Sequence, residues 1–150
     1  MLVNIKVNGI SIQDDVRPDQ LLFDFLRDHG FKSVKCGCET TNCGLCTVWM
    51  DDKSVLSCSV LTVRADGHAI TTLEGVQEEA AEFSDYLAKE GADQCGYCSP
   101  GMIMNVLALK REIPNPTMQQ VKEYLAGNLC RCTGYQGQYR ALAKYFGVEE

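Results

Sequence analysis

The sequence has no long hydrophobic run and no excess of positive charge. No apolar stretch approaches the roughly 18 residues that a membrane-spanning helix needs, so no membrane partner is expected. Lys and Arg number 14 against 20 Asp and Glu, which gives a net charge of −6. Because nucleic acid and anionic lipid both attract a clustered basic surface, neither is an expected ligand.

The groups of a self-sufficient catalyst are missing too. The chain shows no Ser/His/Asp set, paired carboxylates or phosphate-binding glycine loop, so it is not expected to turn over a substrate alone. Its two histidines, His29 and His68, lie far from the cysteines in sequence and are expected at the surface or in turns. The first residues, Met1 to Lys6, alternate like a strand and lack the build of a signal peptide, which predicts a cytoplasmic protein.

Cysteine, in contrast, is abundant, with nine residues in a chain of 150. In a reducing cytoplasm this density indicates metal or redox chemistry rather than structural disulfides. With 45% hydrophobic and 23% charged residues, the composition is that of a folded globular protein. The cysteines therefore carry the functional argument.

Four cysteines in the first half have the spacing of plant-type [2Fe–2S] ligands. Cys38, Cys43 and Cys46 are separated by four and two residues, and Cys58 follows after eleven more. A short loop with this spacing can wrap three thiolates around one cluster, while a fourth comes from a neighbouring strand. A zinc site with four thiolates is the alternative. Cys36 is an alternative to Cys38 with a longer loop, but we expect it to be a flanking thiol.

A second set of four cysteines occupies the other half of the chain. Cys95 and Cys98 form a C-x2-C pair, and Cys130 and Cys132 form a C-x-C pair, with 31 residues between the two pairs. Ser99 and Pro100 are typical of a helix start, and Gly127 of a helix end, so both pairs are expected at adjacent helix termini. The positive end of a helix favours an anionic cluster. Zinc, or a thioredoxin-like redox pair for C-x2-C, are the alternatives.

Hydrophobic periodicity predicts an α+β protein of two domains, residues 1–75 and 76–150. The first domain is predicted to hold strands at 3–7, 10–12, 46–50, 54–63 and 68–72 and a helix at 21–29 closed by Gly30. The second is predicted to be helical at 78–89, 102–111, 121–126 and 137–146, with a Thr117/Gln120 capping box and a closing Gly147.

Taken together, these motifs resemble the iron–sulfur subunit of the molybdenum hydroxylases, the xanthine dehydrogenase and aldehyde oxidoreductase family. The resemblance covers nearly the whole chain. It is carried by QCGYCSPGM at 94–102, GNLCRCTGY at 127–135, CGLCTV at 43–48 and VNG at 7–9. It favours iron–sulfur clusters over zinc at both cysteine sets.

The resemblance implies a β-grasp ferredoxin-like domain followed by a four-helix bundle, each with one [2Fe–2S] cluster. It implies a large partner subunit that binds the molybdopterin cofactor, a second partner that binds FAD, and Gln94 as a hydrogen-bond partner of the pterin. Two departures stand out. Residues 39–42, usually glycine-rich, read Glu-Thr-Thr-Asn, which affects the geometry and potential of the first cluster, and Gln138 replaces a common isoleucine in the last helix.

The leading hypothesis is therefore an electron-relay subunit of a molybdenum-dependent oxidoreductase. It would carry electrons from a molybdopterin site in a partner, through two clusters, to a flavin or another acceptor. The alternatives are a zinc-stapled binding or scaffold module and a free-standing two-cluster ferredoxin. Purines, aldehydes and N-heterocycles are all open as substrates, with purines favoured, because the substrate pocket would lie in another chain.

Overall fold

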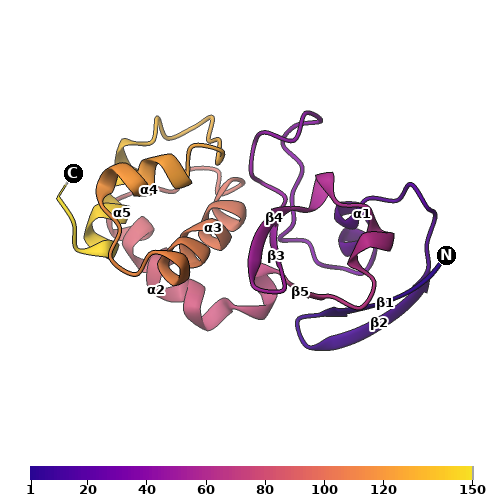
Figure 1. Cartoon of the computed structure of the whole chain (residues 1–150). Coiled ribbons are helices and arrows are strands. Elements are labelled where there is room, and N and C mark those ends of the chain that lie inside the picture. The colour runs from indigo at the N-terminus through magenta and orange to yellow at the C-terminus, as the bar shows by residue number, and fades with distance from the viewer. Residues whose placement is uncertain (150) are drawn as a thin grey trace.

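The computed structural model describes residues 1–149 and shows two parts side by side. The sheet and one short helix form the N-terminal part, and four helices form the C-terminal part, with the two chain ends at opposite extremes of the molecule (Figure 1). This arrangement confirms the predicted α+β class. Within the described residues, no helix is long and apolar enough to cross a membrane.

Five strands form one mixed sheet in the order β2-β1-β5-β3-β4. They are β1 (Leu2–Val7), β2 (Ile10–Asp15), β3 (Thr47–Met50), β4 (Lys53–Leu56) and β5 (Ala69–Thr71). Only β1 and β5 pair in parallel. The predicted turn at Asn8 and Gly9 is confirmed: both have positive φ, 50° and 85°, as a tight hairpin between twisted strands requires.

Helix α1 (Leu22–Asp28) buries Leu22, Phe25 and Leu26 in the hydrophobic core with the sheet. Gly30 follows with φ 90°, as predicted for a helix end. The other face of β1 is exposed, because buried Val3, Ile5 and Val7 alternate with exposed residues. One helix on one face of a mixed sheet is the ferredoxin-like arrangement expected for this half.

The predicted strand at 54–63 is wrong in its second half. Strand β4 ends at Leu56, and two 3-10 turns follow at Ser57–Ser59 and Thr62–Ala65. The chain turns there because both the N–H and the hydroxyl of Ser57 donate to the carbonyl of Cys46. Cys58 therefore lies on a tight turn beside β3 rather than on a strand.

The helical half consists of α2 (Gln77–Lys89), α3 (Ser99–Glu112), α4 (Met118–Tyr124) and α5 (Gln136–Phe146). The capping box of Thr117 and Gln120 is confirmed, and so is Gly147, which has φ 66°. Two predicted boundaries are wrong. The N-cap of α3 is Cys98 and not Ser99, because the Ser99 hydroxyl donates to Asp93 instead. Helix α4 ends at Tyr124, before Gly127.

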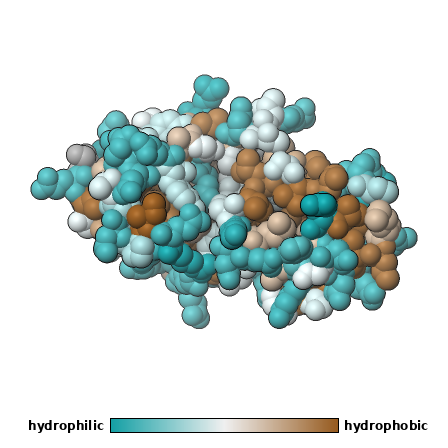
Figure 2. Space-filling model, viewed as in Figure 1, coloured by the Kyte–Doolittle hydropathy of each residue, from teal (hydrophilic) through white to brown (hydrophobic). Residues whose placement is uncertain are grey.

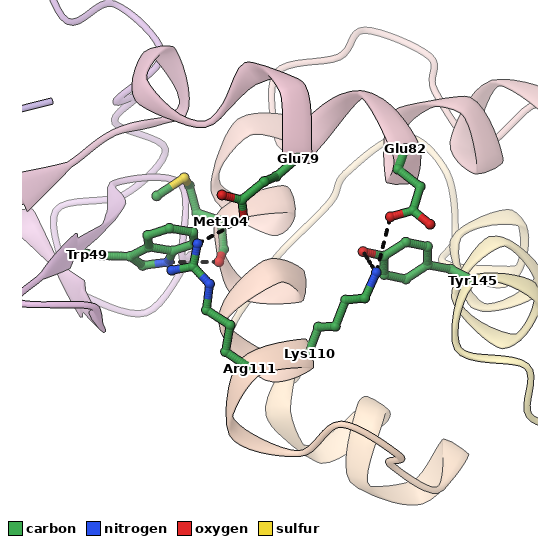
Figure 3. A network of polar contacts seen from close by, with 7 residues as sticks. All are labelled: Trp49, Glu79, Glu82, Met104, Lys110, Arg111 and Tyr145. Carbon is green, nitrogen blue, oxygen red and sulfur yellow. Dashed lines mark hydrogen bonds and ion pairs between the residues drawn. The ribbon is translucent and has the colours of Figure 1, made fainter.

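Trp49 joins the two halves. It lies on β3 but belongs to the hydrophobic core of the helices, where it is 1% exposed. Its indole Nε1 donates to the Met104 carbonyl at 3.0 Å, and the Arg111 guanidinium stacks on its ring at 3.9 Å while bonding Glu79 (Figure 3). The ferredoxin-like sheet is therefore fixed against α3, and through Arg111 against α2.

Candidate metal centres

The first four cysteines converge as two pairs. Cys38 and Cys43 are hydrogen-bonded through their side chains, and the Sγ atoms of Cys46 and Cys58 are 3.2 Å apart. Three of them come from the loop between α1 and β3, and Cys58 from the turn after β4. Cys43 and Cys46 are buried, whereas Cys38 and Cys58 are partly exposed.

Backbone N–H groups of the loop point at these thiols. The N–H groups of Asn42 and Thr40 donate to Cys38 and lower the pKa of its thiol to about 6. To place these donors, Thr41 adopts φ 56°, a left-handed conformation that costs energy for a β-branched residue. The Glu-Thr-Thr-Asn departure thus keeps the N–H cradle of the cluster at the cost of strain.

The second four cysteines also form two pairs. The Sγ atoms of Cys95 and Cys132 are 3.5 Å apart, and Cys98 is hydrogen-bonded to Cys130. Cys95 and Cys132 are exposed, whereas Cys98 and Cys130 are partly buried. As predicted, Cys98 lies at the start of α3. The C-x-C pair was predicted directly after a helix ending at Gly127, but it lies in the loop between α4 and α5.

Within three of the four pairs, one thiol has a lowered pKa and its partner a raised one. Burial, followed by Cys130, raises the pKa of Cys98 to about 11. Burial of Cys130 would raise its pKa as well, but hydrogen bonds from Thr133 lower it. The backbone N–H of Tyr97 lowers the pKa of Cys95, and the bond with Cys95 raises that of Cys132. Two thiols this close resist ionising together unless a cation lies between them. Such a donor set fits a metal centre, because metal binding removes both protons.

Pairs of thiols fit a two-iron cluster better than a single zinc ion. Zinc with four thiolates draws all four sulfurs to about 2.3 Å from one point. In each set, however, the thiols approach one another as two separate pairs. Two thiols for each of two irons is the arrangement that a [2Fe–2S] cluster uses. The pairing therefore favours the cluster over zinc at both sites.

The two sets open onto one cavity of about 570 Å³. It is lined by Cys38 and Cys43 of the first set and by all four cysteines of the second. The backbones around it are in contact, since the Leu129 N–H donates to the Cys43 carbonyl at 2.9 Å. Leu129 precedes Cys130, so one hydrogen bond and a short stretch of chain connect a thiol of each set.

Cys36 and Gln94 lie outside these pairs. Cys36 is exposed, and its thiol donates to the Cys38 carbonyl at 3.0 Å. The backbone bends at Gly37, between Cys36 and Cys38. Gln94 is exposed beside Cys95. His29 and His68 bond Phe25 and Asp51, away from the cysteines.

Sequence reasoning missed two side chains that contact the cysteine loops. The Tyr97 hydroxyl donates to the Cys36 carbonyl at 2.9 Å and so connects the two loops. Gln138, noted in the sequence only for packing, is 3% exposed and lies against Cys98. The one signal for Gln138 was a polar residue at an apolar position of the last helix.

Comparisons with known proteins agree with both sites. Residues 5–88 match the family described as 2Fe-2S iron-sulfur cluster binding domain, and residues 72–143 match the [2Fe-2S] binding domain family. The xanthine dehydrogenase iron-sulfur-binding subunit of Escherichia coli is 42% identical over 139 residues, which cover 89% of this chain and 87% of that protein. The nicotinate dehydrogenase small FeS subunit of Eubacterium barkeri is 42% identical over 136 residues, covering 89% of this chain and 87% of that protein.

The crystal structure of quinoline 2-oxidoreductase from Pseudomonas putida 86 superposes with a TM-score of 0.85 and 35% identity, over 95% of this chain and 90% of that chain. A likeness of this extent spans both halves of the molecule at once. The chain therefore belongs to the family of small subunits of molybdenum hydroxylases that contain two [2Fe–2S] domains.

Proposed function

We propose that this chain relays electrons between two partner subunits of a xanthine dehydrogenase-like complex, one binding molybdopterin and the other FAD. The observation that carries the proposal is the shared cavity onto which both cysteine sets open. Cys38, Cys43, Cys46 and Cys58 would hold one [2Fe–2S] cluster, and Cys95, Cys98, Cys130 and Cys132 the other. When bound, each cluster supplies a one-electron carrier.

Exposure gives the relay a direction. Cys95 and Cys132 are the exposed pair of the helical set and lie beside Gln94, which is free to meet a pterin. Cys98 and Cys130 form the inner pair, and the Leu129 bond to Cys43 leads on to the first set. We infer that the molybdopterin subunit docks at Cys95 and Cys132, and that the flavin subunit docks near Cys58.

A free ferredoxin is the second candidate, and the surface argues against it. A mobile carrier would show polar residues around both clusters. Here Tyr97 and Leu129, next to the helical set, are large hydrophobic side chains that are each 46% exposed. On the face shown in Figure 2, further hydrophobic surface gathers over the ferredoxin-like half. Such surface is typical of a subunit that is covered in its complex.

The cysteines also support the cytoplasm as the compartment of the complex. As proposed cluster ligands, eight of the nine must remain available as thiolates, a state that a reducing compartment maintains. The substrate lies outside this chain; a purine is the one we favour.

The test is to isolate the chain from its native host under anaerobic conditions and identify what accompanies it. The proposal requires a red-brown complex with a molybdopterin-binding and a flavin-binding protein. A red-brown chain that purifies alone would indicate a free ferredoxin, and a colourless zinc protein would indicate a scaffold module. Gln94→Leu should weaken association with the molybdopterin subunit and leave both clusters in place.

A further inference from the structure

Gln138 places a buried amide against one of the proposed cluster ligands. It lies in the first turn of α5, is 3% exposed, and its Nε2 is 3.8 Å from the Sγ of Cys98. An amide N–H is a donor and a thiolate only accepts, so the pair forms an N–H···S hydrogen bond. The reverse orientation would direct the amide oxygen at a negatively charged sulfur.

The packing around Gln138 holds the amide in this position. Gly137 approaches the loop before Cys95 so closely that a Cβ there would lie 3.3 Å from the Ala92 Cα, which fixes the first turn of α5. Gln138 also lines a small cavity with Met102, Leu125 and Leu142, whose lining further includes Asn128 and two tyrosines. Because Gln138 is buried, its hydrogen bond has a larger electrostatic effect than one at the surface.

We propose that Gln138 raises the reduction potential of the helical-domain cluster by donating this hydrogen bond to Cys98. The inference rests on the proposed function and deepens it. Reduction adds one electron to the cluster, and the thiolate ligands share the added negative charge. A donor to a ligand sulfur therefore stabilises the reduced form more than the oxidised form. Gln138 would act on the cluster only through the sulfur of Cys98 and would not ligate iron itself.

The bond depends on the amide, because an apolar side chain such as isoleucine at this position would have no donor. A higher potential at the helical cluster makes it a better acceptor for electrons that enter at Cys95 and Cys132. The chain thereby gains driving force for the first transfer without a change in any ligand.

The experiment compares variants of the intact complex by anaerobic redox titration, followed by electron paramagnetic resonance. Gln138→Met keeps the length of the side chain without a donor, and Gln138→Ile removes the donor with a branched apolar side chain. Gln136→Met changes an exposed glutamine two positions away on the same helix and is the matched control.

At a fixed potential, both Gln138 variants should show a several-fold lower ratio of reduced to oxidised helical cluster. A tenfold change in that ratio corresponds to 59 mV for a one-electron couple. The ferredoxin-like cluster should titrate as in the native complex, and Gln136→Met should leave both clusters unchanged. An unaltered helical potential in Gln138→Met that retains both clusters would overturn the inference.

A measurement on the native complex decides the matter if the variants fail to assemble. With 15N in the glutamine side-chain amides, pulsed paramagnetic resonance should detect a weak nitrogen coupling in the helical signal. Its absence also overturns the inference. Failure of the proposed function would look different, because the native preparation would then lack the two cluster signals or the partner subunits.

Discussion

The thiols of Cys36 and Cys38 lie two residues apart but have different surroundings. Cys38 receives N–H groups from the loop and contacts Cys43, whereas Cys36 is exposed and donates its own hydrogen to the Cys38 carbonyl. Entropy of loop closure hardly separates them as ligands, since its cost grows only logarithmically with length. Local backbone direction makes the difference.

At the scale of single residues, we expect Cys36→Ser to retain both clusters and Cys38→Ser to lose the ferredoxin-like cluster. The reason is that only Cys38 pairs with Cys43. Iron content and the paramagnetic signals of each single variant and of the double variant measure the effect. If Cys38→Ser kept its cluster and the double variant lost it, Cys36 would be a replacement ligand after all.

Thr41 offers a second test in the same loop. Its φ of 56° costs about 1–2 kcal/mol for a residue with a side chain. Glycine adds entropy to the unfolded state, but the strain that it removes is larger. Thr41→Gly should therefore slightly raise the melting temperature of the cluster-loaded chain.

Thr40→Gly is the control, since Thr40 has no positive φ and its replacement should lower stability by about 0.5–1 kcal/mol. Calorimetry of both variants would show opposite signs. Equal losses in the two would mean that the left-handed backbone at Thr41 is not strained.

Between elements, α3 approaches the backbone of the first cysteine loop closely. A Cβ on Gly101 would lie 2.3 Å from the Gly44 carbonyl oxygen and 2.9 Å from the Leu45 Cα, both backbone atoms. Gly44 itself has φ 75° and faces the backbone of residues 127 and 128. Contact without side chains is what lets the two cysteine loops share one cavity.

Gly101→Ala should therefore push α3 away from the loop and cost about 1–3 kcal/mol. Gly127→Ala is the matched control, because a Cβ at residue 127 meets nothing within 4 Å and its φ is not positive. Chemical denaturation should separate the two variants, and electron transfer between the clusters should slow only in Gly101→Ala. Equal stability of both variants would contradict the close contact.

At the scale of the whole molecule, the interface between the halves depends on Trp49 and Arg111. Arg111→Ala removes the stacked guanidinium and its bond to Glu79, at a cost of about 1 kcal/mol. Trp49 is the one tryptophan of the chain, so its fluorescence reports on this interface alone. We expect its emission to shift to the red.

Lys110→Ala is the control for that experiment. Lys110 contacts Glu82 and Tyr145 within the helical half, so its loss should lower stability without moving the emission (Figure 3). A red shift in both variants would show that the emission follows general loosening instead of the interface.

The cluster content of the whole chain should be separable between its halves. The native chain should contain about four iron and four acid-labile sulfide, from two clusters of two irons each. Cys130→Ser should remove the helical cluster and one of two paramagnetic signals, because the other four thiols belong to the ferredoxin-like half. Loss of both signals would show that the interface makes the two sites depend on each other.

The sequence by itself determined the elements that local chemistry controls. Asn8-Gly9, Gly30, Gly147 and the Thr117/Gln120 box each act through their own backbone or their nearest neighbours, so their predictions hold. The spacing of eight cysteines likewise predicted two metal sets, since short loops and helix ends restrict which thiols can meet. Family and cofactors followed from the same motifs.

Only the tertiary structure decided what depends on contacts beyond the nearest neighbours in sequence. The Ser57 bonds to Cys46 end β4 early, and Ser99 turns to Asp93 instead of capping its helix. The pairing of Cys95 with Cys132 and the approach of Gln138 to Cys98 need α3 and α5 in place. Each bond joins segments that the packing of the core brings together. No local sequence pattern predicts that proximity.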